Sequence, residues 1–183
     1  ASPWDLPSAQ FLQEIDVPLF KIASASLTNI EMLREIATYN KPVILSTGMS
    51  TLEEIDAAVE ALKGTDLYIL QCTSAYPAAF EVTNLRAMHT LAHRYGRPVG
   101  FSGHHKGIAI DAAAVALGAC IIERHFTLDR TWKGSDHAAS LEPTGLSRLT
   151  RDLKAVEVSL GDGSKTVLEC ELAPRAKLRG PVK

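Results

Sequence analysis

The chain has 183 residues, of which 46% are hydrophobic and 22% are charged, and its 19 basic and 21 acidic side chains give a net charge of −2. This composition is that of a folded globular protein and argues against a disordered chain. The near-neutral charge argues against a strongly basic nucleic-acid binder. Mean hydropathy is +0.03 and no run of about 18 apolar residues occurs, so we expect no membrane span. The first ten residues lack the basic and apolar regions of a signal peptide.

Five short apolar segments are the predicted β-strands. Most of them are continuously apolar instead of alternating, which is typical of parallel strands that are covered on both faces. The five segments are Leu19–Ala23, Pro42–Thr47, Leu67–Thr73, Pro98–Ser102 and Ala119–Phe126.

The segments between the strands have the patterns of helices. Thr28 or Asn29 can cap the first helix, and Asn84 can cap a helix that runs to Tyr95. The stretch Ser50–Glu53 resembles a capping box, which predicts that a helix begins there. Two more helices are predicted at Ile108–Leu117 and over the leucine stripe Leu146–Leu160, each followed by glycine.

The order of these elements, βα repeated five times, predicts a parallel α/β fold. The strands begin near positions 19, 43, 67, 98 and 119, and the differences of 24, 24, 31 and 21 average about 25 residues. Eight such units would make a (β/α)₈ TIM barrel, so residues 1–160 are expected to form five units of an incomplete one. An open doubly wound sheet is less favoured because no G-x-G-x-x-G turn occurs. Residues 161–183 have turn-like composition and are predicted to be a linker.

Every predicted strand ends in polar side chains. In a parallel α/β sheet the carboxyl ends of the strands meet at one edge, where function collects. Convergence of a lysine, several hydroxyls and histidines there predicts one polar site. These residues include Lys21, Ser24, Ser46, Ser74, Tyr76, Ser102, His104 and His125.

His104 and His125 follow neighbouring predicted strands, so their imidazoles could meet at one ion. Two neutral imidazoles with water and a substrate oxygen would suit Mn²⁺ or a similar divalent ion. The alternative is that each histidine is a hydrogen-bonded core residue, because the sequence has no H-x-x-x-H or H-E-x-x-H motif.

Lys21 lies within an apolar strand, where a lysine is costly unless it is paired. It could form a Schiff base, bind a carboxylate or phosphate, or extend to solvent from a sheet edge. The serine hydroxyls around it suit a ligand rich in anionic oxygens, such as phosphoenolpyruvate.

A long polar loop, residues 128–143, follows the last predicted strand. Its Asp136 and His137 could act as acid or base, although such a loop can also be plain surface. Elsewhere, Cys72, Cys120 and Cys170 form no C-x-x-C pair, which favours reduced thiols in a cytoplasmic protein.

Six segments in order resemble the sialic acid synthase family, whose members join phosphoenolpyruvate to N-acetylmannosamine, its 6-phosphate or related hexoses. The resemblance extends from about Ser2 to Lys177. The segments are KIASASLTN (21–29), KPVILSTGMST (41–51), LQCTSAYP (70–77), VGFSGHHKGI (99–108), ALGACIIERHFTLDRTWKGSDHAASLEP (116–143) and LECELAP (168–174).

The resemblance implies an N-terminal TIM barrel, of which these units would be strands four to eight, followed by a small antifreeze-like domain. It also implies a domain-swapped homodimer in which that domain reaches over from the partner subunit. Residues 161–183 would then lead toward the antifreeze-like domain, which this sequence does not include.

The resemblance also implies roles for individual residues. His104 and His125 would hold Mn²⁺ or Mg²⁺, which would polarise the aldehyde of the sugar, and Tyr76 and Asp136 would contact that sugar. Lys21 would act electrostatically and not as a Schiff base. Many bacterial members have S-D-H where this chain has S-G-H at 102–104, which is more like the branch that makes the 9-phosphate. Contacts to phosphoenolpyruvate are implied for Ser2, Lys21, Ser24, Ser46, Ser74 and Ser102.

The sequence therefore leaves three candidate functions. The first is a phosphoenolpyruvate-dependent synthase of the sialic acid type, including the legionaminic and pseudaminic types. The second is another barrel enzyme, either a lysine-dependent aldolase or a related keto-acid phosphate synthase. The third is a non-catalytic fragment that binds phosphosugar, because upstream strands and a partner domain would be missing.

Overall fold

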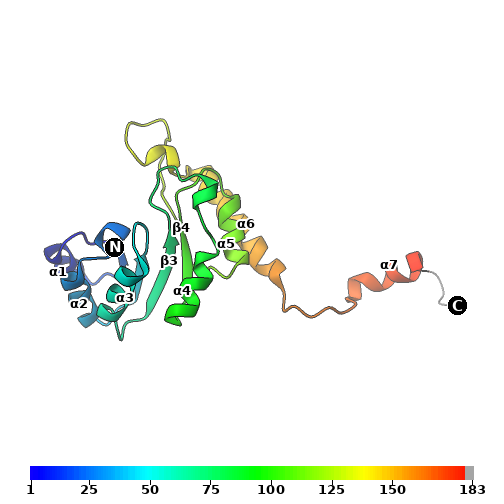
Figure 1. Ribbon diagram of the computed structural model, residues 1–183. Coiled ribbons are helices and arrows are strands. Elements are labelled where there is room, and N and C mark those ends of the chain that lie inside the picture. The colour runs from blue at the N-terminus through cyan, green and yellow to red at the C-terminus, as the bar shows by residue number, and fades with distance from the viewer. Residues whose placement is uncertain (180–183) are drawn as a thin grey trace.

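The computed structural model describes residues 1–179 and contains one five-stranded sheet (Figure 1). All four strand pairs are parallel and the strand order follows the chain, which confirms the predicted α/β fold with five barrel-type units. The strands are β1 (Phe20–Ile22), β2 (Val43–Ser46), β3 (Leu67–Cys72), β4 (Val99–Gly103) and β5 (Ile122–Arg124).

Helices connect the strands and flank the sheet, and the helix that precedes the first strand was not predicted. This is α1, which begins after Asp5, whose carboxylate accepts a hydrogen bond from the backbone N–H of Ser8 at 2.8 Å. Pro7 lies in its first turn, where the missing N–H costs nothing. The helices are α1 (Leu6–Glu14), α2 (Ile30–Thr38), α3 (Leu52–Ala61), α4 (Ala87–Tyr95), α5 (Ala109–Ala116), α6 (Pro143–Leu160) and α7 (Glu169–Arg179).

Three predicted boundaries were wrong. The capping box before α3 joins Thr51 and Glu54, one residue later than expected. Asn84 has a left-handed backbone, with φ of 46°, and the following helix begins only at Ala87, so Asn84 is not its cap. The fifth strand ends at Arg124 because the chain beyond it pairs with the segment around Leu141 instead of with β4.

The predicted linker also contains more structure than expected. Its charged segment Glu169–Arg179 forms α7, and every residue of that helix is exposed. Figure 1 shows α7 well separated from the sheet and its helices. Gly180 and Pro181, which belong to the same predicted linker, lie outside the described residues.

The core lies between the sheet and the helices that cover it. Strand residues Phe20, Ile22, Leu45 and Phe101 are buried there against helix residues such as Ile36. Because the pairing is parallel and in register, the carboxyl ends of all five strands reach the same edge of the sheet. Because the apolar core stabilises the sheet away from this edge, polar side chains can occupy the edge.

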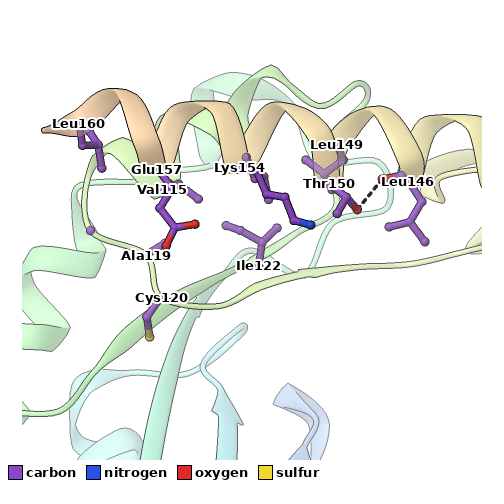
Figure 2. A pocket seen from close by; sticks show the side chains of 12 residues that line it. Val115, Ala119, Cys120, Ile122, Leu146, Leu149, Thr150, Lys154, Glu157 and Leu160 are labelled. Carbon is purple, nitrogen blue, oxygen red and sulfur yellow. Dashed lines mark hydrogen bonds between the residues drawn. The ribbon is translucent and has the colours of Figure 1, made fainter.

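Both edge strands, β1 and β5, have one strand neighbour each in the described chain. Next to β5, α6 stands away from the sheet and leaves a mostly apolar cavity of about 620 Å³. Figure 2 shows Ile122 of β5 below Leu149 and Thr150 of α6. An open apolar edge of this kind is expected of a barrel-type sheet with fewer than eight strands. No helix within residues 1–179 is long and apolar enough to cross a membrane.

Close packing between β3, β4 and the segment before β5 leads to a stability prediction. A Cβ on Gly100 would lie 2.5 Å from Leu70 Cδ2 and 2.6 Å from the carbonyl oxygen of Ile121. Gly100→Ala should therefore lower the free energy of unfolding by about 1–3 kcal/mol, measured by urea denaturation of the complete protein. The matched control is Gly145→Ala, where the nearest atom would be 3.6 Å away and no loss is expected. Equal stability of the two variants would contradict the packing argument.

Candidate active site

A cavity of about 320 Å³ lies at the carboxyl edge of the sheet. Nine of the ten residues predicted for the site line it, and Ser2 does not, because Ser2 is exposed outside the cavity. The nine are Lys21, Ser24, Ser46, Ser74, Tyr76, Ser102, His104, His125 and Asp136. The structure thus brings together side chains from all five strand ends and from the loop after β5.

Lys21 is the cation of this cavity. Its side chain is only 16% exposed, so it does not extend into bulk solvent as the edge-lysine alternative requires. The ammonium donates hydrogen bonds to Ser46 Oγ at 2.7 Å and to the carbonyl of Ile22 at 2.9 Å. Burial lowers the pKa of Lys21, and the nearby carboxylate of Glu123 opposes that shift.

Glu123 belongs to the site but was not predicted as a site residue. Its Oε2 lies 3.4 Å from Lys21 Nζ, and its Oε1 accepts a hydrogen bond from Ser102 Oγ at 2.7 Å. The carboxylate therefore links β1, β4 and β5 across the cavity and balances the lysine charge. The sequence shows Glu123 only as one of the polar residues at the end of the fifth predicted strand, without the partners that identify its role.

Gly48 and Cys72 were also missed, and both lie against the serine hydroxyls. Ser24 Oγ accepts a hydrogen bond from the N–H of Gly48 at 2.9 Å and donates one to Cys72 Sγ at 3.5 Å. A Cβ on Gly48 would meet Ser74 Oγ and would lie 2.8 Å from Ser24 Oγ. Only glycine leaves this polar space open, a requirement that no sequence pattern revealed.

The two histidines form a close pair, with ring centroids 5.1 Å apart. His104 is 5% exposed, and its Nδ1 lies 3.1 Å from the carbonyl of Thr73. A carbonyl can only accept, so Nδ1 carries the hydrogen and Nε2 of the neutral ring has a free lone pair. Burial lowers the pKa of both histidines, and His104 lowers that of His125 further, so both rings are neutral near pH 7.

Tyr76 and Asp136 complete the wall around the histidines. The Tyr76 ring lies 4.3 Å from the His104 ring and 5.6 Å from the His125 ring, and burial raises the pKa of Tyr76. Asp136 Oδ2 lies 3.8 Å from His125 Nδ1. His137, the other candidate of this loop, does not line the cavity, because its Nδ1 pairs with Thr127 Oγ1 at 2.7 Å.

The two histidines fit a metal ion that is held by only a few protein atoms. Within residues 1–179 no group of three or more His, Cys, Asp or Glu side chains is arranged to hold a metal. The pair His104 and His125 could supply two imidazole nitrogens and leave other positions to water and substrate. The hydrogen bond from His104 Nδ1 to a carbonyl is the usual arrangement for orienting a metal-binding imidazole.

The model of the NeuB family matches residues 1–165, which include every residue that lines the cavity. The chain belongs to the NeuB family. This membership confirms the predicted resemblance to the sialic acid synthase family.

Characterised NeuB relatives have several different products. The chain is 44% identical to the N,N'-diacetyllegionaminic acid synthase of Campylobacter jejuni over 93% of this chain and 53% of that protein. It is also 44% identical to human N-acetylneuraminate-9-phosphate synthase over 97% of this chain and 50% of that protein. The chain thus spans about half the length of these relatives. Equal identity to two synthases with different products does not select a sugar.

A solved NeuB-family structure supports the same fold. The N-acetylneuraminic acid synthetase of Leptospira borgpetersenii, crystallised with citrate, superposes with a TM-score of 0.87 at 39% identity. The alignment covers 99% of this chain and 65% of that one. The five βα units described above therefore have the same fold as the corresponding part of that synthetase.

Proposed function

We propose that the complete protein condenses phosphoenolpyruvate with N-acetylmannosamine or its 6-phosphate, giving N-acetylneuraminate or its 9-phosphate and inorganic phosphate. The observation that supports this most strongly is one cavity that combines Lys21 and its serines with the pair His104 and His125. A synthase for a related legionaminic or pseudaminic acid is the second candidate, because a legionaminic acid synthase is as similar as the 9-phosphate synthase.

Phosphoenolpyruvate is proposed to bind at the lysine side of the cavity. Its carboxylate and phosphate would be held by the buried ammonium of Lys21 and by hydroxyls that carry no charge of their own. Such preorganised donors hold the two anionic groups without reorganisation during the reaction. The proposed contacts are Lys21, Ser24, Ser46, Ser74 and Ser102.

The sugar is proposed to bind at the histidine side, against Tyr76 and Asp136. His104 and His125 would hold Mn²⁺ or Mg²⁺ there through their neutral rings. When bound, such an ion supplies Lewis-acid polarisation of the open-chain aldehyde. The protein's own contribution is to place that aldehyde carbon next to C3 of phosphoenolpyruvate.

The proposed bond changes balance without any redox partner. C3 of phosphoenolpyruvate attacks the aldehyde carbon, the resulting cation at C2 takes up water, and the C2–O bond to phosphate then breaks. One phosphoenolpyruvate, one hexosamine and one water thus become one sugar acid and one phosphate. Lys21 and the serines hold the carboxylate and phosphate throughout.

Several properties of the complete protein are proposed from the sequence resemblance. We propose a domain-swapped homodimer in which residues 161–183 lead to an antifreeze-like domain, and little or no turnover by residues 1–183 alone. The three cysteines form no disulfide, which supports the proposed cytoplasmic location.

Phosphate release by the complete protein tests this proposal. We expect release from phosphoenolpyruvate only when a hexosamine and Mn²⁺ or Mg²⁺ are both present. Borohydride added with pyruvate or phosphoenolpyruvate should leave Lys21 unmodified. A covalent adduct on Lys21 would instead favour a Schiff-base aldolase and contradict the electrostatic role.

Gly48 gives a sharper prediction for the phosphoenolpyruvate side. Gly48→Ala places a methyl group against the hydroxyls of Ser24 and Ser74, so we expect phosphoenolpyruvate affinity to fall at least tenfold, about 1.4 kcal/mol. Affinity can be measured by isothermal titration calorimetry without metal. Gly145→Ala is the control, because Gly145 does not line the cavity and a Cβ there would meet only Leu141 at 3.6 Å or more. Unchanged affinity of Gly48→Ala would place the ligand elsewhere.

A further inference from the structure

We propose that Asp111, Arg124 and His105 form a buried positioning network that sets the spacing of His104 and His125. This inference rests on the proposed metal-binding role of the two histidines. None of the three network residues lines the cavity, so any effect on the ion passes through the histidines that they support.

The network is a compact charge cluster behind the site. Asp111, in the first turn of α5, is fully buried, and its Oδ2 lies 2.5 Å from Arg124 Nη1 and 3.4 Å from His105 Nε2. Arg124 and His105 are also buried, and Arg124 Nη1 lies 3.2 Å from His105 Nε2. The His105 ring stacks on Phe101 at 5.9 Å, which holds it against the β4 side of the cluster.

Two of the three network residues, Arg124 and His105, are adjacent in sequence to residues of the site. Glu123 of β5 and His125 just after that strand line the cavity, whereas Arg124 between them reaches the α5 side of the sheet. His105 likewise follows His104 directly. Successive side chains of an extended chain point to opposite faces, so the network lies behind the two histidines.

Strand pairing alone does not join the two histidines. The β4–β5 register ends at Gly103 opposite Arg124, and His104 and His125 come just beyond it. The carbonyl of His104 instead accepts a hydrogen bond from Ala78, and that of His125 accepts one from Leu141. Their backbones thus pair away from each other.

The side chain of Arg124 connects the two segments that carry the histidines. Its guanidinium donates hydrogen bonds to the carbonyl of His105 at 2.7 Å and to that of Gly107 at 2.8 Å. The planar fork therefore holds the loop after β4 against β5 at the level of both histidines. Asp111 in turn fixes the fork, because a buried guanidinium needs a carboxylate partner.

The cluster is tightly packed, and the described residues offer no other hydrogen-bond partners for several of its buried atoms. Asp111 Oδ1, Arg124 Nε and His105 Nδ1 are buried and make no hydrogen bond within the described residues. A Cβ on Gly103 would lie 2.8 Å from the Phe101 ring and 3.1 Å from Asp111 Oδ1, so the surrounding packing is tight. Loss of the carboxylate should therefore shift the Arg124 fork and the loop that it holds.

The test is Mn²⁺ affinity of the complete protein, measured by isothermal titration calorimetry. Asp111→Asn, nearly the same size but uncharged, should weaken Mn²⁺ binding by about 10–100-fold, the usual effect of removing a supporting partner. Phosphoenolpyruvate affinity without metal should change less than threefold. The control is Asp56→Asn, which removes the carboxylate of the exposed Arg94 pair and should leave both affinities unchanged.

If Asp111→Asn does not fold, a second variant tests the same network. Arg124→Lys keeps the charge but replaces the planar fork, whose two terminal nitrogens each bind one carbonyl, with a single ammonium on a flexible stem, and it should weaken Mn²⁺ binding in the same way. Wild-type Mn²⁺ affinity in a folded Asp111→Asn or Arg124→Lys protein, even one that melts earlier, would show a purely structural role and overturn the proposal.

The proposed function and the network fail in different ways. If the wild-type protein binds Mn²⁺ no better than His104→Ala with His125→Ala, the metal role itself is wrong and the network proposal is overturned with it. If wild-type binding depends on the histidines but no synthase activity is found, the reaction is wrong while the effect of Asp111→Asn still tests the network.

Discussion

Lys21→Met is expected to weaken phosphoenolpyruvate binding by about 100-fold. Methionine has a similar length but no charge, so the ligand loses a charge-assisted hydrogen bond contributing about 1.5–3 kcal/mol. Glu123, which lies 3.4 Å from the ammonium, would then face the anionic ligand uncompensated. Titration calorimetry of the complete protein with phosphoenolpyruvate, without metal, measures the effect.

The control for this substitution is Lys41→Met. Lys41 pairs with Asp16 and the carbonyl of Val17, away from the cavity-lining residues, so its replacement should leave affinity unchanged. The affinity for phosphoenolpyruvate should also depend on pH. Because burial lowers the pKa of Lys21, binding should be complete below that pKa and be lost as pH rises through it, before an ordinary lysine would deprotonate. Equal affinity of Lys21→Met and wild type would refute the anion-binding role.

His104→Ala combined with His125→Ala is expected to abolish Mn²⁺ binding and to lower turnover by at least about 10³-fold. The two imidazoles are the proposed protein ligands, and the described residues offer no cluster of three or more that could replace them. Electron paramagnetic resonance of Mn²⁺ reports binding, and phosphate release reports turnover.

The matched control is His93→Ala on α4, because His93 is exposed and does not line the cavity. It should bind Mn²⁺ and turn over like the wild type. Activity that persists in the double variant and in the presence of a chelator would rule out the metal role.

Much of the fold follows from the sequence because the strands here are short apolar runs in register. The five predicted strands all form, and the polar residues that follow them meet at one edge as parallel pairing requires. The exact ends of the strands were harder to predict, because they depend on contacts with residues that are distant in sequence. The fifth strand is shorter than Ala119–Phe126 since Leu141, distant in sequence, pairs with the chain after β5.

The missed site residues show a different limit. Glu123 is recognisable only once Lys21 and Ser102 are seen on either side of it, and Gly48 only once its distance to Ser24 is known. Both depend on contacts between segments that are 21 or more residues apart in the chain. The ends of neighbouring predicted strands already placed the two histidines together, whereas the Asp111 network depends on side-chain contacts that only the structure shows.

The central claim is that this cavity brings phosphoenolpyruvate and an open-chain hexosamine together for condensation with loss of phosphate. The most direct measurement follows phosphoenolpyruvate labelled with ¹⁸O at the oxygen between C2 and phosphorus, incubated with the complete protein, N-acetylmannosamine and Mn²⁺. We predict that the label leaves with the phosphate, because the C2–O bond breaks, and that no phosphate forms without the hexosamine. Label retained in the sugar acid, or phosphate released without hexosamine, would contradict the account.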